Sequence, residues 1–269
     1  MSSLAAPASS VRVTQLRVVR SEWTKFRSVR STYWSLLVAL LLLIGIGILV
    51  CAIFTARWPH LGAHERASFQ PLRASLVGVN FAQLAVGVLG VLVITAEYST
   101  GAIRATFSAV PKRLPVLWAK TGVFAAVALV LSLPAVFIVF FAGQSILSAH
   151  HVNVSISHPG VLRALLGAAL YLMVMGVFGL GLGAILRSTA GGISALAAIV
   201  FVLPPVVGLF PASFANAVTP YLPSNAGGAV WTIHPDPNTL APWAGLAVFC
   251  GYAVVAIAIA ALLTLRRDA

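Results

Sequence analysis

Six long runs of apolar residues, joined by more polar stretches, dominate the pattern of this chain. Each run is long enough to cross the roughly 30 Å of hydrocarbon in a bilayer, which takes a helix of about 20 residues. A backbone inside lipid must satisfy its own hydrogen bonds, so the runs predict an all-α integral membrane protein with six transmembrane helices. The predicted spans cover residues 33–54, 74–96, 116–142, 164–186, 190–210 and 242–265.

A basic amphipathic segment precedes the first span. We expect residues 1–10 to be disordered, whereas residues 11–30 have the period of a helix. Glu22 and Arg30 break its pattern of one apolar and one basic half. Such a helix, with aromatic residues on its apolar face, is typical of the membrane interface. The alternative is a solvated charged segment that only leads into the membrane. The apolar half contains Leu16, Val18, Val19, Trp23, Phe26 and Val29.

The connection between the second and third spans, residues 94–120, has a helical pattern of its own. We predict a short helix over residues 99–109, capped by Ser99 or Thr100. An apolar stripe at i, i+4 and i+7 runs along it. Because the stripe has no core of its own, we expect it to pack on the membrane ends of the bundle or on a partner. The stripe consists of Ile103, Phe107 and Val110.

The fifth span and the connection after it are irregular. Pro204 and Pro205 predict a break in the helix, because proline lacks a backbone donor and clashes with the preceding turn. Residues 212–219 and 225–231 predict two short helices separated by a proline turn. We therefore expect re-entrant outer helices between spans five and six.

Small and polar residues within the spans predict helix contacts. Asn80 and Gln83 share one face of the second span and must meet partners or water, because exposure to lipid is costly. They either make interhelical hydrogen bonds or line a translocation path. Glycines that provide small faces for close packing are Gly87, Gly90, Gly176, Gly179, Gly181 and Gly183.

The charge distribution fits membrane topology rather than nucleic-acid binding. Of the residues, 60% are hydrophobic and 8% are charged, and the net charge is +12. With the N-terminus inside, 13 basic residues fall on the cytoplasmic side and four on the outer side, as the positive-inside rule requires. Fourteen arginines against three lysines, with abundant alanine and valine, indicate a GC-rich bacterial genome. We therefore predict one domain, residues 11–269, in a bacterial cytoplasmic membrane with both termini inside.

No motif for nucleotide binding or catalysis is present in the sequence. A phosphate-binding loop needs Gly-Lys-Ser/Thr, and no glycine precedes Lys25, Lys112 or Lys120. The five acids offer no paired carboxylates within the bilayer, so coupling to ions within this chain is not expected. Energy for transport would then come from another subunit.

Histidine and cysteine give no strong alternative site. All six histidines fall on the predicted outer side, and His60 and His64 have the i, i+4 spacing of helical metal ligands. Because the surrounding sequence is loop-like, we expect solvated histidines and no metal. Cys51 and Cys250 lie in apolar runs and are expected to be small buried hydrophobes rather than a disulfide or metal pair.

Four features together resemble the permease subunits of type-2 ABC transporters, in particular a small six-span actinobacterial-like form. The first two are the basic segment RSEWTKFRSVRSTYW before span one and the series EYSTGAIRATFSAVPKR, followed by Lys120, between spans two and three. The others are the six-span count with short ends and the segment YLPSNAGGAV after span five. The second feature is the most specific, because a generic membrane protein has no reason to place a polar, glycine and basic series there.

This resemblance implies a subunit that pairs with a second permease, identical or related, and with ATP-binding cassette ATPase subunits on separate chains. ATP and Mg would be bound by the ATPase, so this chain would hold no cofactor and would not itself be an enzyme. Residues 11–30 would form the interface helix, with Leu16, Val19, Trp23 and Phe26 on its apolar face. Substrate would pass between the two permeases along spans two and five, and export of a lipophilic drug, lipid, glycan or peptide is the expected direction.

The same resemblance makes residues 99–109 the coupling helix that docks on the ATPase. Two other functions stay open: a non-transporting membrane scaffold or sensor that uses its outer loops, and a membrane-embedded enzyme with its site in the histidine-bearing loops. The residues expected at the docking site are Glu97, Gly101, Ile103, Arg104, Phe107, Pro111, Lys112 and Arg113.

Overall fold

The computed structural model describes residues 15–28, 30–101, 113–233 and 238–266, and this part of the chain is all helical. Six helical segments are long and apolar enough to cross a membrane, as the sequence predicts. The third extends well beyond residue 142, where the sequence predicts its end, and the fifth stops short of residue 210. The segments are Tyr33–His60, Pro71–Ser99, Leu114–His150, Val161–Leu186, Thr189–Val207 and Pro242–Arg266.

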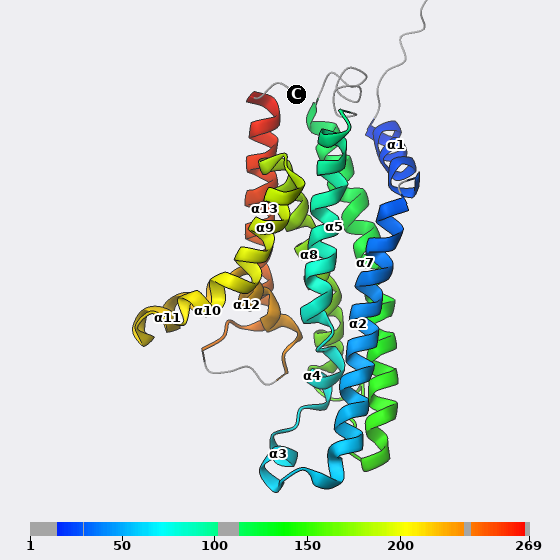
Figure 1. Ribbon diagram of the computed structural model, residues 1–269, viewed down its shortest axis with the longest axis vertical. Helices are drawn as coiled ribbons and strands as arrows, with labels where there is room; N and C mark the ends of the chain where they lie inside the picture. The colour runs from blue at the N-terminus through cyan, green and yellow to red at the C-terminus, as the bar shows by residue number, and fades with distance from the viewer. Residues whose placement is uncertain (1–14, 29, 102–112, 234–237, 267–269) are drawn as a thin grey trace, which may run out of the picture.

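The helices run lengthwise through an elongated bundle (Figure 1). We call the end where α1 begins and α13 ends the terminal end, and the opposite end the distal end; α5 ends and α7 begins at the terminal end (Figure 1). The longer helices are α1 (Gln15–Ser28), α2 (Arg30–Arg57), α5 (Val79–Ser99), α7 (Arg113–Leu147), α8 (Val161–Leu186), α9 (Thr189–Ala197) and α13 (Pro242–Arg266). The short helices at the distal end of α2, α5 and α7 are η1 (Trp58–His60), α3 (Ala63–Ser68), α4 (Pro71–Leu76) and η2 (Ser148–His150).

The core of the bundle forms around α8, which packs against α5, α7 and α13. Leu172 and Met175 of α8 are fully buried in the same cluster as Val136 of α7 and Phe249 of α13. By contrast, α2 and α13 leave many large apolar side chains exposed, among them Leu41 and Leu262. Apolar side chains on the outside of a bundle of this length are what a lipid environment requires.

Glycines bring α5 and α8 close together, as the sequence predicts. A Cβ atom on Gly90 would overlap the carbonyl oxygen of Gly176, and one on Gly179 would overlap that of Gly87. Both obstacles are backbone atoms, which cannot rotate away. Only glycine therefore allows these two helices to approach this closely, the usual use of small residues at helix interfaces in membranes.

The regular α-helix of the fifth span is interrupted just before the two prolines at which the sequence predicts a kink or break. After α9, the chain forms a π-helical turn, η3 (Ala198–Val202), and then the short helix α10 (Leu203–Val207), which contains Pro204 and Pro205. The sequence does not predict the π-turn itself, but such turns are common where the regular hydrogen-bond ladder is interrupted.

The chain after the break first leaves the bundle and then returns to it. α10 and α11 (Ala212–Val218) project sideways from it (Figure 1). Through η4 (Thr219–Tyr221) the chain returns to α12 (Pro223–Gly228) and η5 (Ala229–Trp231). α12 packs against α13, and η5 packs against α8 and α13. The two short helices expected over residues 212–219 and 225–231 are thus present within about two residues of their predicted bounds.

Candidate functional site

α1 lies against the terminal ends of the spanning helices, where it packs mainly on the first part of α7. Val18 of α1 is buried against Val116 and Ala119 of α7. Phe26 meets Phe124 of α7 in an edge-on contact, with ring centroids 6.4 Å apart. The interface helix is therefore attached to the bundle by a face of its own.

The four residues that the resemblance assigns to the apolar face of the interface helix lie in two different environments. Phe26 and Val19 are partly buried against α7 and its neighbours, whereas Leu16 and Trp23 are 75% and 45% exposed. Exposed leucine and tryptophan on a helix at the end of a membrane bundle suit contact with lipid at the interface. The buried face instead contains Glu22, the residue that interrupts the amphipathic pattern.

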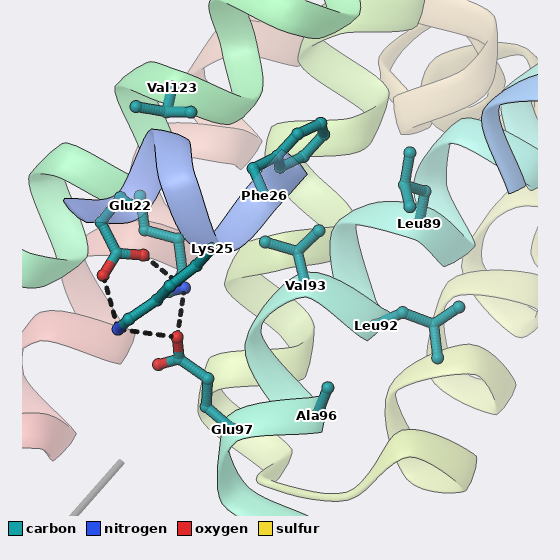
Figure 2. Close-up of a pocket in the computed structure, with 10 residues that line it drawn as sticks. Glu22, Lys25, Phe26, Leu89, Leu92, Val93, Ala96, Glu97 and Val123 are labelled. Atoms are coloured by element: carbon teal, nitrogen blue, oxygen red, sulfur yellow. Dashed lines mark hydrogen bonds and ion pairs between the residues drawn. The ribbon is translucent and has the colours of Figure 1, made fainter. Parts of the chain in front are cut away.

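Glu22 belongs to a cluster of four charged side chains, which we call the charge cluster: Glu22, Lys25, Glu97 and Lys120. Glu97 lies two residues before the end of α5, and Lys120 lies in the second turn of α7. Figure 2 shows the carboxylates of Glu22 and Glu97 turned toward the ammonium groups between them. The cluster therefore joins α1 to both helices that flank the connection between spans two and three.

Acids and bases alternate around the charge cluster in a closed ring. Lys120 Nζ lies 2.7 Å from Glu22 Oε2 and 2.9 Å from Glu97 Oε1. Lys25 Nζ lies 2.8 Å from Glu22 Oε1 and 3.1 Å from the same Glu97 oxygen. Each base thus contacts both acids and each acid contacts both bases, an arrangement that offsets much of the cost of removing four charges from water.

Burial is deepest for Glu22 and Lys120, whose side chains are 2% and 4% exposed. Lys25 is the most accessible member, with 38% of its side chain exposed. Burial lowers the pKa of Lys25, but its hydrogen bonds to Glu22 and Glu97 and the charges of both carboxylates outweigh this effect, so its pKa lies above the ordinary value. Lys25 is therefore charged at neutral pH and completes the ring.

A small cavity of about 80 Å³ adjoins the charge cluster, with apolar walls that include Leu92, Val93 and Val123 (Figure 2). Within the described residues, Glu97 Oε2 is buried without a hydrogen-bond partner. The cavity has room for water beside this oxygen, because one water needs only about 10–15 Å³ of such space.

The end of α5 has further contacts that the sequence did not predict. The guanidinium carbon of Arg187, at the end of α8, lies 5.1 Å from the centre of the Tyr98 ring. Thr189 Oγ1, at the start of α9, donates a hydrogen bond of 2.9 Å to Thr95 Oγ1. The last turn of α5 is thus connected to α1 and α7 on one side and to the α8–α9 connection on the other.

The predicted coupling stretch lies directly after this last turn. Ser99 is the last residue of α5 and Thr100 follows it, and both hydroxyls donate to the carbonyl oxygen of Ala96. Neither residue therefore begins a separate helix at position 99. Gly101 has φ +70°, a left-handed conformation suited to glycine after a helix end. Ile103, Arg104, Phe107, Pro111 and Lys112 lie outside the described residues, and Arg113 begins α7.

Asn80 and Gln83 do not share one environment, although they share a face of α5. Gln83 is buried, donates to the carbonyl oxygen of Asn80 and accepts a hydrogen bond from the hydroxyl of Tyr171 in α8. It therefore serves as an interhelical contact, the first of the two roles considered for this pair. Asn80 is exposed at the distal end and lines a hollow there.

The histidines are not arranged as metal ligands in the described residues. His60 ends η1 and His64 lies in α3, so the two do not share a helix. His150 stacks on Trp58 and hydrogen-bonds to the carbonyl oxygen of Thr55. No group of three or more possible ligands occurs within residues 15–28, 30–101, 113–233 and 238–266. Both cysteines are free, with Cys51 buried.

One sequence signal could have revealed the charge cluster. Glu22 is an acid in the middle of a basic amphipathic helix, and Glu97 and Lys120 stand where one predicted span ends and the next begins. Charges at such positions need partners, but the sequence does not say which ones pair. Comparison with known proteins adds no assignment: no protein-family model and no curated protein matches the chain.

Proposed function

We propose that this chain is a permease subunit of an ABC transporter, moving a substrate across a bacterial cytoplasmic membrane with energy from a separate ATPase subunit. The observation that carries the proposal is the charge cluster, which attaches α1 to both helices flanking residues 100–112. A partner that pulls on this connection would move α1, α5 and α7 together. A coupling segment requires such an attachment.

The sequence motifs support the same function. The series from Glu97 to Arg113 resembles the coupling stretch of type-2 ABC permeases, and the chain has no phosphate-binding loop of its own. Glu97 and Lys120, the two members of the charge cluster that belong to spanning helices, lie near the ends of those helices and not in their middle. Proton-coupled transporters commonly place ionisable groups at the midplane, so an external ATPase is the better fit.

The proposal also gives the bundle an orientation and a path. The terminal end would face the cytoplasm, because the basic residues concentrate there. A second permease, identical or related, would pack alongside, and substrate would leave along α5 and the broken fifth span. A lipophilic or amphiphilic cargo and the direction of export follow from the resemblance to type-2 ABC permeases and are part of the proposal.

The proposal is tested by co-expressing the chain with its candidate ATPase and replacing Arg104 or Phe107 with alanine. We expect each variant to lose most co-purified ATPase, or most transport-stimulated ATP hydrolysis, because both residues belong to the proposed docking helix. Arg266→Ala and Leu262→Ala are matched controls, since they remove an exposed cation and an exposed apolar side chain from α13. Both controls should behave as wild type.

Unchanged assembly and unchanged ATP turnover in both docking variants would rule out this coupling assignment. A stable complex whose ATP hydrolysis does not respond to any cargo would favour a scaffold or sensor instead. Stoichiometric metal in the purified protein would favour the enzyme alternative.

A further inference from the structure

We propose that the distal end of the bundle contains a binding site for an anionic amphiphile, centred on Arg73. Arg73 lines three hollows, and the two larger ones form the proposed site: one is polar and the other is largely aromatic and aliphatic. A role of this site in transport rests on the proposed function, whereas binding at the site is argued from its geometry alone.

The polar hollow has a volume of about 450 Å³, within the range of small-molecule sites. It lies between the start of spanning segment Pro71–Ser99 and the returning helices η4, α12 and η5. Its walls are rich in amide and hydroxyl groups, and Arg73 is their only charged residue in the described part of the chain. Among the lining residues are Gln70, Arg73, Asn80, Ser224, Asn225 and Thr232.

Several wall residues already use their donors within the protein. Asn225 donates to the carbonyl oxygen of Thr219, Ser224 to that of Val200, and Asn80 to that of Val77. These contacts fix the amide and hydroxyl groups in place around the hollow. A preorganised polar wall favours a ligand that carries its own donors, such as hydroxyl groups, beside the anionic group.

Arg73 differs from Arg66 and Arg163, two other arginines at the distal end, in having no hydrogen-bond or ring partner among the described residues. Arg66 donates to the carbonyl oxygen of Pro59 and lies over the Trp58 ring, and Arg163 donates to the carbonyl oxygen of Thr232. The guanidinium of Arg73 makes no such hydrogen bond, although it lines both hollows. A guanidinium has five donors in a fork that matches phosphate and carboxylate oxygens.

A second donor in the wall also lacks an acceptor. The indole Nε1 of Trp231 is buried without a hydrogen bond in the described part of the protein, and Trp231 lines the polar hollow with Arg73. Because this nitrogen is covered, a ligand would reach it only after the indole turns. Arg73 is therefore the group that binds first in our proposal.

The aromatic hollow provides a place for an apolar chain. It has a volume of about 420 Å³ and shares Gln70 and Arg73 with the polar hollow. Phe54, Phe69 and Val50 contribute apolar walls, and Phe54 and Phe69 contact each other with ring centroids 4.8 Å apart. Glu65 is also in this wall, but it forms no ion pair with Arg73.

This arrangement selects an amphiphile with three parts: an anionic group at Arg73, a polar portion in the polar hollow and a hydrocarbon chain in the aromatic hollow. A fully apolar compound would leave the amides and Arg73 without ligands. A simple inorganic anion would leave the aromatic hollow empty. The chemistry is shared by a transported amphiphile and by a bilayer lipid with an anionic headgroup, and the experiment separates them.

The test is a titration of the full-length chain, purified in a neutral maltoside detergent, with dodecyl phosphate, followed by native mass spectrometry. We expect saturable binding of dodecyl phosphate at one site and at least ten-fold weaker binding of dodecyltrimethylammonium. Arg73→Gln should weaken dodecyl phosphate binding about ten-fold, in line with the loss of a charge-assisted hydrogen bond. Arg73→Lys should retain part of the affinity.

Matched variants distinguish the loss of a local contact at Arg73 from a general loss of positive charge at the distal end. Arg57 is exposed at the distal end but lines neither hollow. If Arg73 acts by direct contact and not by long-range charge, Arg57→Gln should bind dodecyl phosphate with an affinity within about two-fold of wild type. Asp236, outside the described residues but two positions before Asn238 of the polar wall, is tested as Asp236→Asn. Equal weakening by Arg73→Gln and Arg57→Gln, or binding that appears only in Asp236→Asn, would overturn the proposal.

Competition identifies the source of the anionic group. Displacement of dodecyl phosphate by phosphatidylglycerol in wild type points to a bilayer lipid, whereas displacement by other single-chain alkyl phosphates but not by phosphatidylglycerol points to a transported amphiphile. Because no ATPase is present, this result is independent of the proposed function. If cargo stimulates ATP hydrolysis but dodecyl phosphate does not bind, the proposal of this binding site is wrong and the proposed transport function is retained.

Discussion

Lys120 is the residue on which the charge cluster most depends. It is almost fully buried and makes one short ion pair to α1 and another to α5. Lys25 contacts the same two acids, but its side chain is more than one-third exposed, so solvent screens its contribution. The two bases are therefore unequal, although they have the same partners.

We expect Lys120→Met to lower the free energy of unfolding by about 3 kcal/mol, because it leaves two buried carboxylates with a single, partly exposed base. The measurement is denaturant unfolding in mixed micelles. Lys25→Met is the matched control and should cost clearly less, about 1 kcal/mol or below.

The double variant Glu97→Gln with Lys120→Met separates the pair from its surroundings. If the two residues interact as the structure indicates, the double variant should be less destabilised than the sum of the single variants. Strict additivity, or a Lys25→Met variant as unstable as Lys120→Met, would contradict the unequal roles of the two bases.

At the scale of whole elements, the contact between α5 and α8 sets the geometry of the bundle. Both helices carry glycines at the points where their backbones meet, and α8 in turn contacts α7 and α13. A displacement of α5 would therefore require α8 to shift, and with it the helices that pack on α8. Tyr98 and Thr95 add polar contacts from α5 to the α8–α9 connection.

Gly90→Ala should separate α5 from α8 and destabilise the protein by about 2–3 kcal/mol, because the new methyl group meets the backbone of Gly176. Gly122→Ala in α7 is the matched control: apart from its own stretch of helix, no atom lies within 4 Å of the added carbon, so the change should be neutral or slightly stabilising. Thermal unfolding of both variants in the same detergent measures the difference. Equal melting temperatures would show that the two helices can shift apart at no cost.

The elements differ in how far the sequence could predict them. Length and hydropathy were sufficient for the six spans, and proline chemistry was sufficient to predict an irregular helix near Pro204 and Pro205, although not the π-helical turn just before them. The orientation of α1 was not predictable from its apolar residues, because Glu22 turns inward toward a base 98 positions later in the chain. Pairings over such separations depend on the packing of α5 and α7, which no local pattern encodes.

At the scale of the whole molecule, α5 and the short helix before it join two polar regions at opposite ends of the bundle. Glu97 belongs to the charge cluster at the terminal end, whereas Asn80 lines the polar hollow at the distal end. Between them, the Gly87–Gly90 region packs tightly on α8. The two polar regions therefore lie on either side of this tight contact, at opposite ends of the same spanning segment.

This relation between the two ends requires that they face opposite sides of the membrane, and single cysteines can test it. Ser99→Cys and Ser157→Cys place exposed thiols at the terminal and distal ends, and each cysteine has nearly the shape of the exposed serine that it replaces. Both are made in a background in which Cys51 and Cys250 are changed to serine. If the terminal end is cytoplasmic, as the distribution of basic residues predicts, a membrane-impermeant maleimide should label Ser157→Cys in intact cells. Ser99→Cys should react only after the membrane is opened.

The reverse labelling pattern would invert the orientation while leaving the fold intact, and it would place the proposed coupling segment out of reach of a cytoplasmic ATPase. Labelling of both positions in intact cells would contradict the assignment of the two ends to opposite sides. The result at Ser99 therefore bears most directly on function, because the segment that follows it can meet an ATPase only from the cytoplasm.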